Sequence, residues 1–346
     1  MRTVSGTDAQ LTRKAGEKHS DMDDLIFFAP VKKQTIWGGD SLAAQYGFDT
    51  PGTPIAEAWT VSAHPSGDCV AVGGTWDGVS LSRLWKEQPQ LFACPWEQQF
   101  PLLIKFIDAA RPLSVQVHPD DAYAAAHETT ADGSRCRGKS ECWYVVSAQP
   151  GATLVLGHTA ATRQEAVRLI EEDRWDELLR TVPVRAGDFF RIDPGTVHAI
   201  GAGIIILETQ QSSDVTYRLY DYGRLQNGRP RPLHLRQSLD VMTVPACETA
   251  ERPQLMPTAP QRGTATLTRL EKCDYFSVYK LDLDGALTLP GPVGFVAVTV
   301  LEGTGTVNGC PVKKGQSFVV PHPVEQVVCD GCFTAVFSQP EQPRTF

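Results

Sequence analysis

The sequence predicts a mainly β protein with two barrel-like units of one kind and a small helical insertion in the first unit. Most apolar runs are strand-sized and are separated by Gly, Pro or Asp. The spacing that runs from Gly187 to His198 recurs from Gly315 to Gln326, which indicates an internal repeat. Three prolines between residues 248 and 263 predict a linker between the two copies.

Composition and charge narrow the class of protein. The chain has 346 residues, 42% of them hydrophobic, and a net charge of -8, which argues against nucleic acid as a partner. No apolar run reaches the roughly 18 residues of a membrane span, so no membrane contact is expected. The first 24 residues lack the apolar stretch of a secretory signal and are expected to form a mobile tail. Nine scattered cysteines favour reduced thiols and a cytoplasmic location. The oligomeric state is not predicted.

The first unit is expected to span residues 25–247. Strands are predicted near residues 25–31 and 57–64, and a short helix near 80–86. The apolar runs 101–109 and 113–118 are joined by Ala-Arg-Pro and are expected to form a hairpin-like pair. A second helix is predicted over residues 120–127.

Further elements complete the first unit and open the second. Residues 141–147 and 153–157 are predicted to resume the sheet, and Thr162-x-x-Glu165 is a capping-box pattern that begins a helical insertion over about residues 159–181. A last helix is predicted near 235–242. The second unit, residues 264–346, is predicted to be all β, and Asp330-Gly331 is expected to form a tight hairpin turn.

Four residues from three separate segments of the chain form a candidate metal site. Gln116 and His118 share one face of a strand because side chains alternate along it. Glu141 begins the next strand of the sheet, and His198 is presented by a Pro-Gly corner. One carboxylate, two imidazoles and an amide oxygen suit zinc and leave a position for water or substrate. A Gln-x-His pair alone is more often a surface feature.

A second group of polar residues follows His198. Glu208, Asp214 and Arg218 are close enough in sequence to line the same mouth of the barrel, where they could serve catalysis or form an ordinary ion-pair network. Because the chain is acidic, an anionic substrate needs a local group of Lys and Arg. Lys139 could bind a phosphate there as a point charge.

The chain resembles the type I phosphomannose isomerases of the short bacterial form. The resemblance rests on several short stretches in order: IWGG (36–39), LSVQVHP (113–119), GKSECWY (138–144), GTVHAIG (195–201), LETQQ (207–211) and TYRLYDY (216–222). Together these motifs are highly specific, and they cover the chain from about Leu25 to Val244.

The resemblance implies a fold, an activity and roles for residues. It implies a cupin (jelly-roll) scaffold and the zinc-dependent interconversion of mannose 6-phosphate and fructose 6-phosphate, with one Zn²⁺ per chain. The family's roles would fall on the following residues: Gln116, His118, Glu141 and His198 as metal ligands, Ser114 and Lys139 at the phosphate, Arg218 as the catalytic arginine, and Lys105, Glu208 and Asp214 in the substrate pocket.

The expected chemistry moves a proton between C1 and C2 of the sugar through an enediol. Glu208 is the first candidate for the proton carrier, with Lys105 and Asp214 as rivals, and Arg218 is expected to stabilise the enediolate. Two alternatives remain at this point: a metal-dependent cupin oxygenase and a sugar-binding cupin without catalysis. Gln116 in place of a second histidine on that strand argues against the oxygenase.

Overall fold

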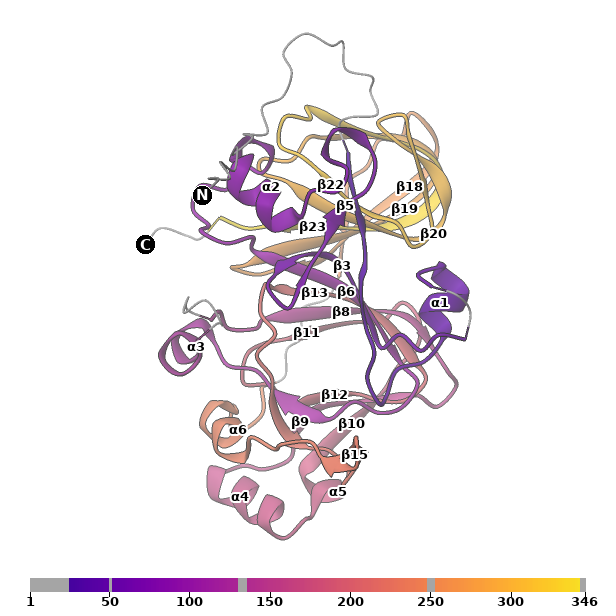
Figure 1. Cartoon of the computed structure of the whole chain (residues 1–346). Helices are drawn as coiled ribbons and strands as arrows, with labels where there is room; N and C mark the ends of the chain where they lie inside the picture. The colour runs from indigo at the N-terminus through magenta and orange to yellow at the C-terminus, as the bar shows by residue number, and fades with distance from the viewer. Residues whose placement is uncertain (1–24, 50–51, 130–135, 248–252, 343–346) are drawn as a thin grey trace, which may run out of the picture.

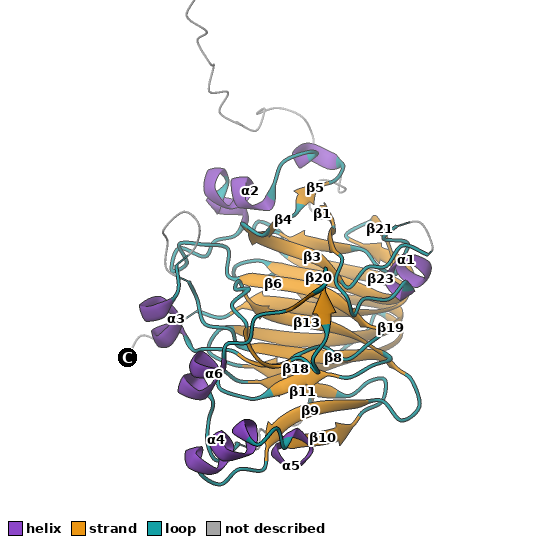
Figure 2. Ribbon diagram, turned by 60° about the horizontal axis from the view of Figure 1, so that its bottom comes forward, coloured by secondary structure: helices purple, strands orange, loops and turns teal. Residues whose placement is uncertain are grey.

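The computed structural model describes residues 25–49, 52–129, 136–247 and 253–342, and it shows a mainly β molecule (Figure 1). The predicted mobile tail, residues 1–24, lies outside the described residues. Three large sheets make up the fold, and the short helices lie at their margins (Figure 2). The middle sheet of the three carries Lys105 and Glu208, two of the four candidate catalytic residues.

Two antiparallel sheets form the first unit. The seven-stranded sheet has the order β11-β8-β13-β6-β3-β2, with β4 beside β3. Its strands are β2 (Val31–Lys33), β3 (Glu57–His64), β4 (Gly67–Asp68), β6 (Leu102–Ala109), β8 (Glu141–Ala148), β11 (Phe189–Ile192) and β13 (Ile204–Gln211). The five-stranded sheet has the order β10-β9-β12-β7-β14, with strands β7 (Val115–Val117), β9 (Thr153–His158), β10 (Leu179–Pro183), β12 (His198–Ile200) and β14 (Tyr217–Tyr220).

The two sheets pack against each other around one apolar core. Trp143 and Ile206 from the seven-stranded sheet and Leu154 and Ile200 from the five-stranded sheet belong to this core, and all four are buried. Burial of such side chains away from water is the main driving force that holds two sheets together. The candidate metal ligands are distributed over both sheets.

The expected hairpin between residues 101–109 and 113–118 is wrong. Strand β6 lies in the seven-stranded sheet, whereas β7 lies in the five-stranded sheet. The Ala110–Pro112 segment therefore crosses from one sheet to the other, and Pro112 cannot donate a ladder hydrogen bond there. This crossing places Lys105 of β6 and His118, just after β7, in different sheets of the sandwich.

Alternation along β13 explains how charged side chains come to lie in the interior. Ile204 and Ile206 pack into the core between the two sheets of the first unit, whereas Ile205 and Leu207 pack on the opposite face. Because side chains alternate along a strand, Glu208 lies on the same face as Ile206. The strand is buried over its whole length, and Glu208 is 2% exposed.

The second unit is a nine-stranded sheet with a core of its own. Its order is β17-β18-β19-β23-β20-β22-β1-β5, with β21 beside β20. The strands are β17 (Gln254–Met256), β18 (Arg262–Lys272), β19 (Phe276–Pro290), β20 (Val296–Val307), β21 (Cys310–Lys313), β22 (Ser317–Val320), β23 (Gln326–Pro340), β1 (Ile26–Ala29) and β5 (Val70–Ala71). Two closed barrels remain a prediction. Strand β17 lies within the expected linker and pairs with β18.

The expected hairpin turn at Asp330-Gly331 is also wrong, because β23 continues through both residues. Gly331 instead lies opposite Gly285 on one side and Gly305 on the other. A side chain at Gly331 would approach the backbone of Gly305 to 2.5 Å. Glycine at this position allows two neighbouring strands to come close together, which is one of the roles of glycine inside a sheet.

The two units share a core and do not separate cleanly at the linker. Strand β1, at the start of the described chain, pairs with β22 of the second unit. Phe92 and Phe100 of the first unit pack against Phe295 of the second, edge-on and tilted respectively, with ring centroids 5.5 and 5.0 Å apart. The Thr209 hydroxyl lies 2.9 Å from that of Ser338. The first unit therefore depends on the second for part of its packing.

Some of the described helices cover one face of the five-stranded sheet. The described helices are α1 (Ser41–Tyr46), α2 (Leu81–Glu87), α3 (Asp121–His127), α4 (Arg163–Glu171), α5 (Trp175–Leu178) and α6 (Leu235–Val241), with 3₁₀ turns at Gly74–Trp76 and Pro89–Leu91. The Thr162 side chain accepts a hydrogen bond from the Glu165 amide at the start of α4. Leu169 of α4 and Leu178 of α5 pack with Val117 and Leu219 of the sheet.

Two further findings concern the chain as a whole. None of the helices in the described ranges has the length and apolar character needed to cross a membrane. None of the nine cysteines, all of which lie in the described ranges, takes part in a disulfide. A small hairpin, β15 (Leu225–Gln226) with β16 (Arg229–Pro230), follows β14. In the sequence, this hairpin lies between Arg218 and α6.

Candidate metal centre and active site

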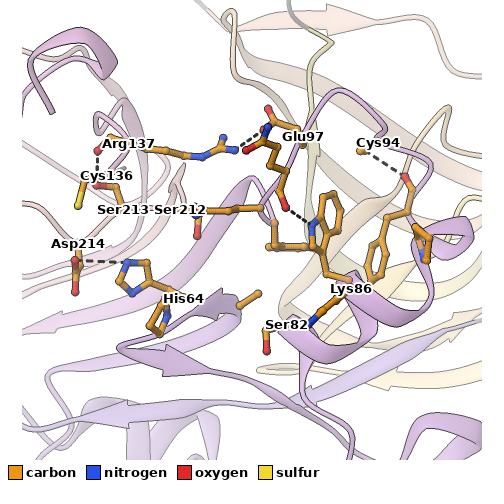
Figure 3. A pocket seen from close by; sticks show the side chains of 18 of the residues that line it. His64, Ser82, Lys86, Cys94, Glu97, Cys136, Arg137, Ser212, Ser213 and Asp214 are labelled. Atoms are coloured by element: carbon orange, nitrogen blue, oxygen red, sulfur yellow. Dashed lines mark hydrogen bonds and ion pairs between the residues drawn. The ribbon is translucent and has the colours of Figure 1, made fainter. Parts of the chain in front are cut away.

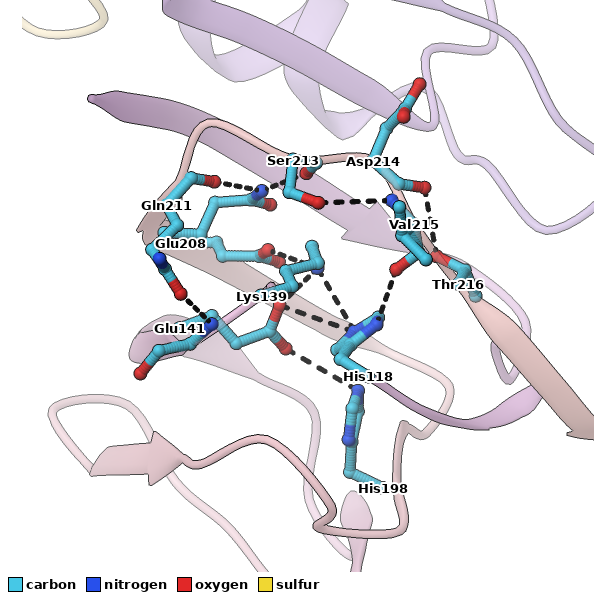
Figure 4. Close-up of polar contacts among 12 residues, drawn as sticks. His118, Lys139, Glu141, His198, Glu208, Gln211, Ser213, Asp214, Val215 and Thr216 are labelled. Carbon is cyan, nitrogen blue, oxygen red and sulfur yellow. Dashed lines mark hydrogen bonds and ion pairs between the residues drawn. The ribbon is translucent and has the colours of Figure 1, made fainter. Parts of the chain in front are cut away.

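Three of the four predicted metal ligands meet at one buried point. The candidate ligand atoms of His118, Glu141 and His198 lie within 4.8 Å of one another, and each residue is at most 1% exposed (Figure 4). His118 follows β7, Glu141 is the first residue of β8, and His198 is the first residue of β12. Strands from two facing sheets therefore bring together residues that are up to 80 positions apart.

Backbone carbonyls fix the tautomer of both imidazoles. The Nδ1 atom of His118 lies 2.8 Å from the carbonyl oxygen of Val215, and Nδ1 of His198 lies 2.8 Å from that of Thr196. A carbonyl oxygen can only accept, so each neutral ring carries its proton on Nδ1. Each Nε2 atom keeps a lone pair, and each lies 3.5 Å from an oxygen of Glu141.

This donor set fits a zinc ion. The Nε2 atom of His198 and the Oε1 atom of Glu141 are buried and have no hydrogen-bond partner within the described part of the chain. Burial lowers the pKa of His198 to about 4, and burial together with Lys139 and His198 lowers the pKa of His118 well below its usual value. Two neutral imidazoles and a carboxylate, oriented by backbone hydrogen bonds, are typical of zinc sites.

Gln116 belongs to the same row of side chains. In the five-stranded sheet, Gln116 lies directly opposite His198 of β12 on one side and Arg218 of β14 on the other. Residues that are directly opposite in neighbouring strands point to the same face of the sheet. Because His198 points into the sandwich, Gln116 and Arg218 point there as well. This register supports Gln116 as a fourth ligand, which stays a prediction.

Two lysines and Glu208 surround the metal-ligand cluster. The ammonium group of Lys139 contacts a Glu141 oxygen and lies 3.2 Å both from Nε2 of His118 and from Oε1 of Glu208. Lys105 lies 3.5 Å from the same Glu208 oxygen. Lys139 is 4% exposed and Lys105 is 8% exposed. A buried charge of one sign costs much less free energy when an opposite charge lies beside it, so the residues of this group depend on each other.

The pKa values of Glu208 and Lys105 are both raised, but for different reasons. Burial raises the pKa of Glu208, and the negative charge of Glu141 raises it further, while Lys105 and Lys139 oppose the shift. Burial alone would lower the pKa of Lys105, but the carboxylates of Glu208, Glu57 and Glu141 raise it overall. Lys105 therefore keeps its proton at neutral pH, whereas Glu208 is poised to exchange one.

Glu57 is a member of the site that the sequence did not single out. One of its carboxylate oxygens lies 3.3 Å from the ammonium group of Lys105 and 2.7 Å from Nε1 of Trp59. Glu57 begins β3, directly next to β6, and lies near Lys105. The signal in the sequence that could have identified Glu57 was a carboxylate at the start of an otherwise apolar alternating strand.

Ser114 and Arg218 form a hydrogen-bonded pair on the same face of the five-stranded sheet as Gln116. The Nε atom of Arg218 donates to the Ser114 hydroxyl at 3.2 Å, and Nη1 donates to the Pro232 carbonyl at 3.0 Å. Burial lowers the pKa of Arg218, and so does the positive charge of Arg231 and Arg224. Arg224 and Arg231 both bind the carboxylate of Asp221. Two guanidinium groups thus bind one aspartate, and both act electrostatically on Arg218.

Asp214 lies away from the metal-ligand cluster. Its side chain is 46% exposed; Oδ2 accepts from the Ser66 hydroxyl at 2.6 Å, and Oδ1 lies 3.5 Å from Nε2 of His64. Figure 4 shows the carboxylate pointing away from His118 and Glu141. A role in proton transfer stays a prediction, and these contacts do not bring Asp214 to Glu208.

One cavity is lined in part by the segment whose carbonyl holds His118. The cavity has a volume of about 920 Å³, and His64, Ser213, Asp214 and Val215 line one side of it (Figure 3). Among its described lining residues are none of the three cluster residues. The shared element is the segment 212–216, whose Val215 carbonyl holds His118. Cavity size alone is therefore a poor guide to the chemistry here.

Comparisons with known proteins agree with the geometry. Residues 26–137 match the family described as "Phosphomannose isomerase type I, catalytic domain", and residues 266–340 match "Mannose-6-phosphate isomerase, cupin domain". The chain is 41% identical to mannose-6-phosphate isomerase ManA of Bacillus subtilis over 90% of this chain and 98% of that protein. It is also 41% identical to the mannose-6-phosphate isomerase of Streptococcus mutans over 90% of this chain and 96% of that protein.

The chain is also similar in fold to a solved structure. The crystal structure of the mannose 6-phosphate isomerase from Bacillus subtilis superposes with a TM-score of 0.86 at 36% sequence identity, and the match covers 91% of this chain and 99% of that one. Sequence and fold therefore agree along almost the whole length. On these grounds the chain belongs to the type I phosphomannose isomerase family.

Proposed function

We propose that this protein is a zinc-dependent aldose–ketose isomerase that interconverts mannose 6-phosphate and fructose 6-phosphate. One observation carries the proposal: the ligand atoms of His118, Glu141 and His198 converge in a buried site next to a carboxylate, Glu208, whose pKa is raised. The names of the relatives in two bacterial species supply the substrate. The reaction needs a group that moves a proton, a stabiliser for an oxyanion and an anchor for the phosphate.

The proposed metal site holds one zinc ion per chain, with His118, Glu141 and His198 as ligands and Gln116 as the fourth. When bound, zinc acts as a Lewis acid that orients and polarises sugar oxygens. The chain's own contribution is to keep both imidazoles neutral, through burial, and to keep each Nε2 atom aimed at the site through the Nδ1 hydrogen bonds.

Glu208 is the proposed proton carrier. As a carboxylate it takes the proton from C2 of mannose 6-phosphate, which leaves an enediolate with its negative charge on O1. The proton of the O2 hydroxyl moves to O1, and Glu208, now a carboxylic acid, returns a proton to C1 as the C2 carbonyl forms. Lys105 is a poor candidate because the surrounding carboxylates hold its proton in place. Asp214 is a poor candidate because its oxygens contact Ser66 and His64. Lys105 is instead proposed to balance the charge on Glu208.

Arg218 is proposed to stabilise the enediolate. It points into the sandwich from the strand next to Gln116, and a guanidinium group stays charged even where burial lowers its pKa. Its hydrogen bond to Ser114 places a hydroxyl next to the positive charge. The phosphate is proposed to bind near this pair, where Arg231 adds positive charge. A local excess of arginine would attract the anionic phosphate although the chain as a whole carries a net charge of -8.

Lys139 has contacts that favour a role other than phosphate binding. The family resemblance assigns it to the phosphate, together with Ser114. Its contacts with Glu141, Glu208 and His118 favour a second role, in which the ammonium group balances negative charge at the metal centre. The two roles predict different kinetic effects, and a variant can separate them.

A coupled assay with mannose 6-phosphate tests the proposal. The protein is assayed as purified, after removal of metal with a chelator, and after zinc is restored. We expect activity to be lost on chelation and to return with about one equivalent of zinc. Isomerisation that persists undiminished in the fully chelated protein would contradict the zinc dependence. Oxygen uptake without isomerisation would instead support the cupin oxygenase alternative.

A further inference from the structure

The orientation of His118 depends on a residue 97 positions further along the chain. The carbonyl oxygen of Val215 accepts the Nδ1 proton of His118 at 2.8 Å. This hydrogen bond leaves the lone pair on Nε2, the atom that lies 3.5 Å from Glu141. If the Val215 carbonyl moved away, the ring could adopt the other tautomer or turn about its Cβ–Cγ bond. The position of Val215 therefore determines whether His118 can act as a ligand.

Val215 lies in a segment that has no strand pairing to hold it. Strand β13 ends at Gln211 and β14 begins at Tyr217. Side-chain contacts hold the residues between them: the Ser213 hydroxyl donates to the Arg137 carbonyl at 2.9 Å and accepts from the Val215 amide at 3.4 Å. The geometry of this segment depends on such contacts, because no regular ladder determines it.

Asp214 ties this segment to the turn between β3 and β4. Its Oδ2 atom accepts from the Ser66 hydroxyl at 2.6 Å, and its Oδ1 atom lies 3.5 Å from Nε2 of His64. The Ser66 amide donates to Nδ1 of His64 at 3.1 Å, so a neutral His64 carries its proton on Nε2, facing Asp214. We call these three residues, His64, Ser66 and Asp214, the clasp.

We propose that Asp214 is a positioning residue for the metal centre, which acts through the clasp by holding the Val215 carbonyl against His118. The inference rests on the proposed function only where it concerns zinc. It assigns to Asp214 a role different from proton transfer. Its two oxygens contact the seven-stranded sheet, and its neighbour in the chain orients a ligand carried by the five-stranded sheet.

The place of the clasp in the molecule agrees with such a role. His64, Pro65, Asp214 and Val215 line both the cavity of about 920 Å³ and a second one of about 530 Å³. His64 and Asp214 of the clasp thus form part of the wall between two cavities, and Val215 connects this wall to His118 of the metal-ligand cluster. Loss of this wall would let water reach His118, and water would compete with the Val215 carbonyl for the Nδ1 proton.

Zinc affinity provides the first test. The dissociation constant of zinc is measured by competition with a chromophoric chelator for the wild-type protein and the variants Asp214→Ala, Ser66→Ala and Asp214→Asn. We expect Asp214→Ala to weaken zinc binding about tenfold, at the low end of the effects of residues that support metal ligands. Asp214→Asn keeps an acceptor for Ser66 and should recover most of the loss. Asp240→Ala is the matched control, because Asp240 is also exposed and its carboxylate lies near a hydroxyl, that of Tyr123.

Histidine tautomers provide a second test that needs no metal. In metal-free protein labelled with ¹⁵N-histidine, wild-type His118 should be observed as the Nδ1–H tautomer, and Asp214→Ala should show a mixture. An Asp214→Ala variant with unchanged zinc affinity and an unchanged His118 tautomer would overturn the inference. Loss of turnover in that same variant would then point to proton transfer. By contrast, undiminished zinc binding in His118→Ala would count against the proposed metal centre and would leave the tautomer test to decide the clasp.

Discussion

The Nε2 atom of His198 lies 3.5 Å from the Oε1 atom of Glu141, and neither atom has a hydrogen bond to any residue in the described ranges. Leaving buried polar atoms without partners costs about 1–3 kcal/mol each, so a fold retains them only where they have a use. A cation bound between the two atoms would satisfy both. This relationship leads to predictions about metal content, catalysis, phosphate binding and stability.

The first prediction concerns metal content. His198→Ala should reduce bound zinc from about one per chain to near zero, because the site loses a neutral imidazole that the fold positions. Metal analysis after dialysis against a weak chelator measures this loss. His158→Ala is the matched control: His158 is a buried histidine of the same sheet, hydrogen-bonded to the Thr243 carbonyl. Equal zinc loss in both variants would show that the effect is not specific to the site.

The second prediction concerns proton transfer. Glu208→Gln keeps the size of the side chain but cannot carry a proton, so kcat should fall by about 10²–10⁴-fold with zinc content unchanged. Steady-state kinetics at saturating mannose 6-phosphate, together with metal analysis, checks both statements. Glu172→Gln, at an exposed position at the end of α4, provides the control. Normal turnover in Glu208→Gln would remove Glu208 from the mechanism.

The third prediction separates the two roles of Lys139. If its ammonium group balances charge at the metal centre, Lys139→Ala should lower kcat or zinc affinity, because Glu141 and Glu208 are left as neighbouring carboxylates. If it binds phosphate, KM should rise strongly while zinc content stays constant. The contacts favour the first result. A rise in KM alone would restore Lys139 to the phosphate site.

The fourth prediction concerns the arginine cluster at Asp221. Arg231→Ala should raise KM for mannose 6-phosphate about tenfold or more, because it removes positive charge next to Arg218. Arg262→Ala removes an arginine that is also paired with an aspartate, Asp330, but lies in the second unit. It should leave KM unchanged. The same KM in wild type and Arg231→Ala would place the phosphate elsewhere.

The fifth prediction concerns the core that the two units share. Phe295→Ala should lower the free energy of unfolding by about 3–5 kcal/mol, since it removes a fully buried ring that packs against Phe92 and Phe100. All seven tryptophans lie between residues 37 and 175, so tryptophan fluorescence during urea unfolding reports on the first unit. We expect its midpoint to fall although the substitution is in the second unit. Val293→Ala, at an exposed site, should have no effect.

The sequence predicted the nature of most elements and the identity of the cluster residues. Local patterns were sufficient for several helices, as Thr162 and Glu165 show, because a capping box acts within one turn. Helix α1 was not predicted. Local patterns were insufficient for strand partners. The hairpin expected around Ala110–Pro112 and the turn expected at Asp330-Gly331 were wrong, because which strands pair depends on contacts between distant parts of the chain.

The sequence by itself determined the mainly β character of the protein, the membership of its family and the chemical type of the candidate ligands. Only the tertiary structure decided that Lys139 contacts Glu141 and Glu208, that Glu57 joins Lys105, and that Asp214 contacts Ser66 and His64. The physical reason is distance along the chain. Residue types and periodicity are local properties, whereas charge pairing in a buried site depends on which side chains two facing sheets bring within a few ångströms.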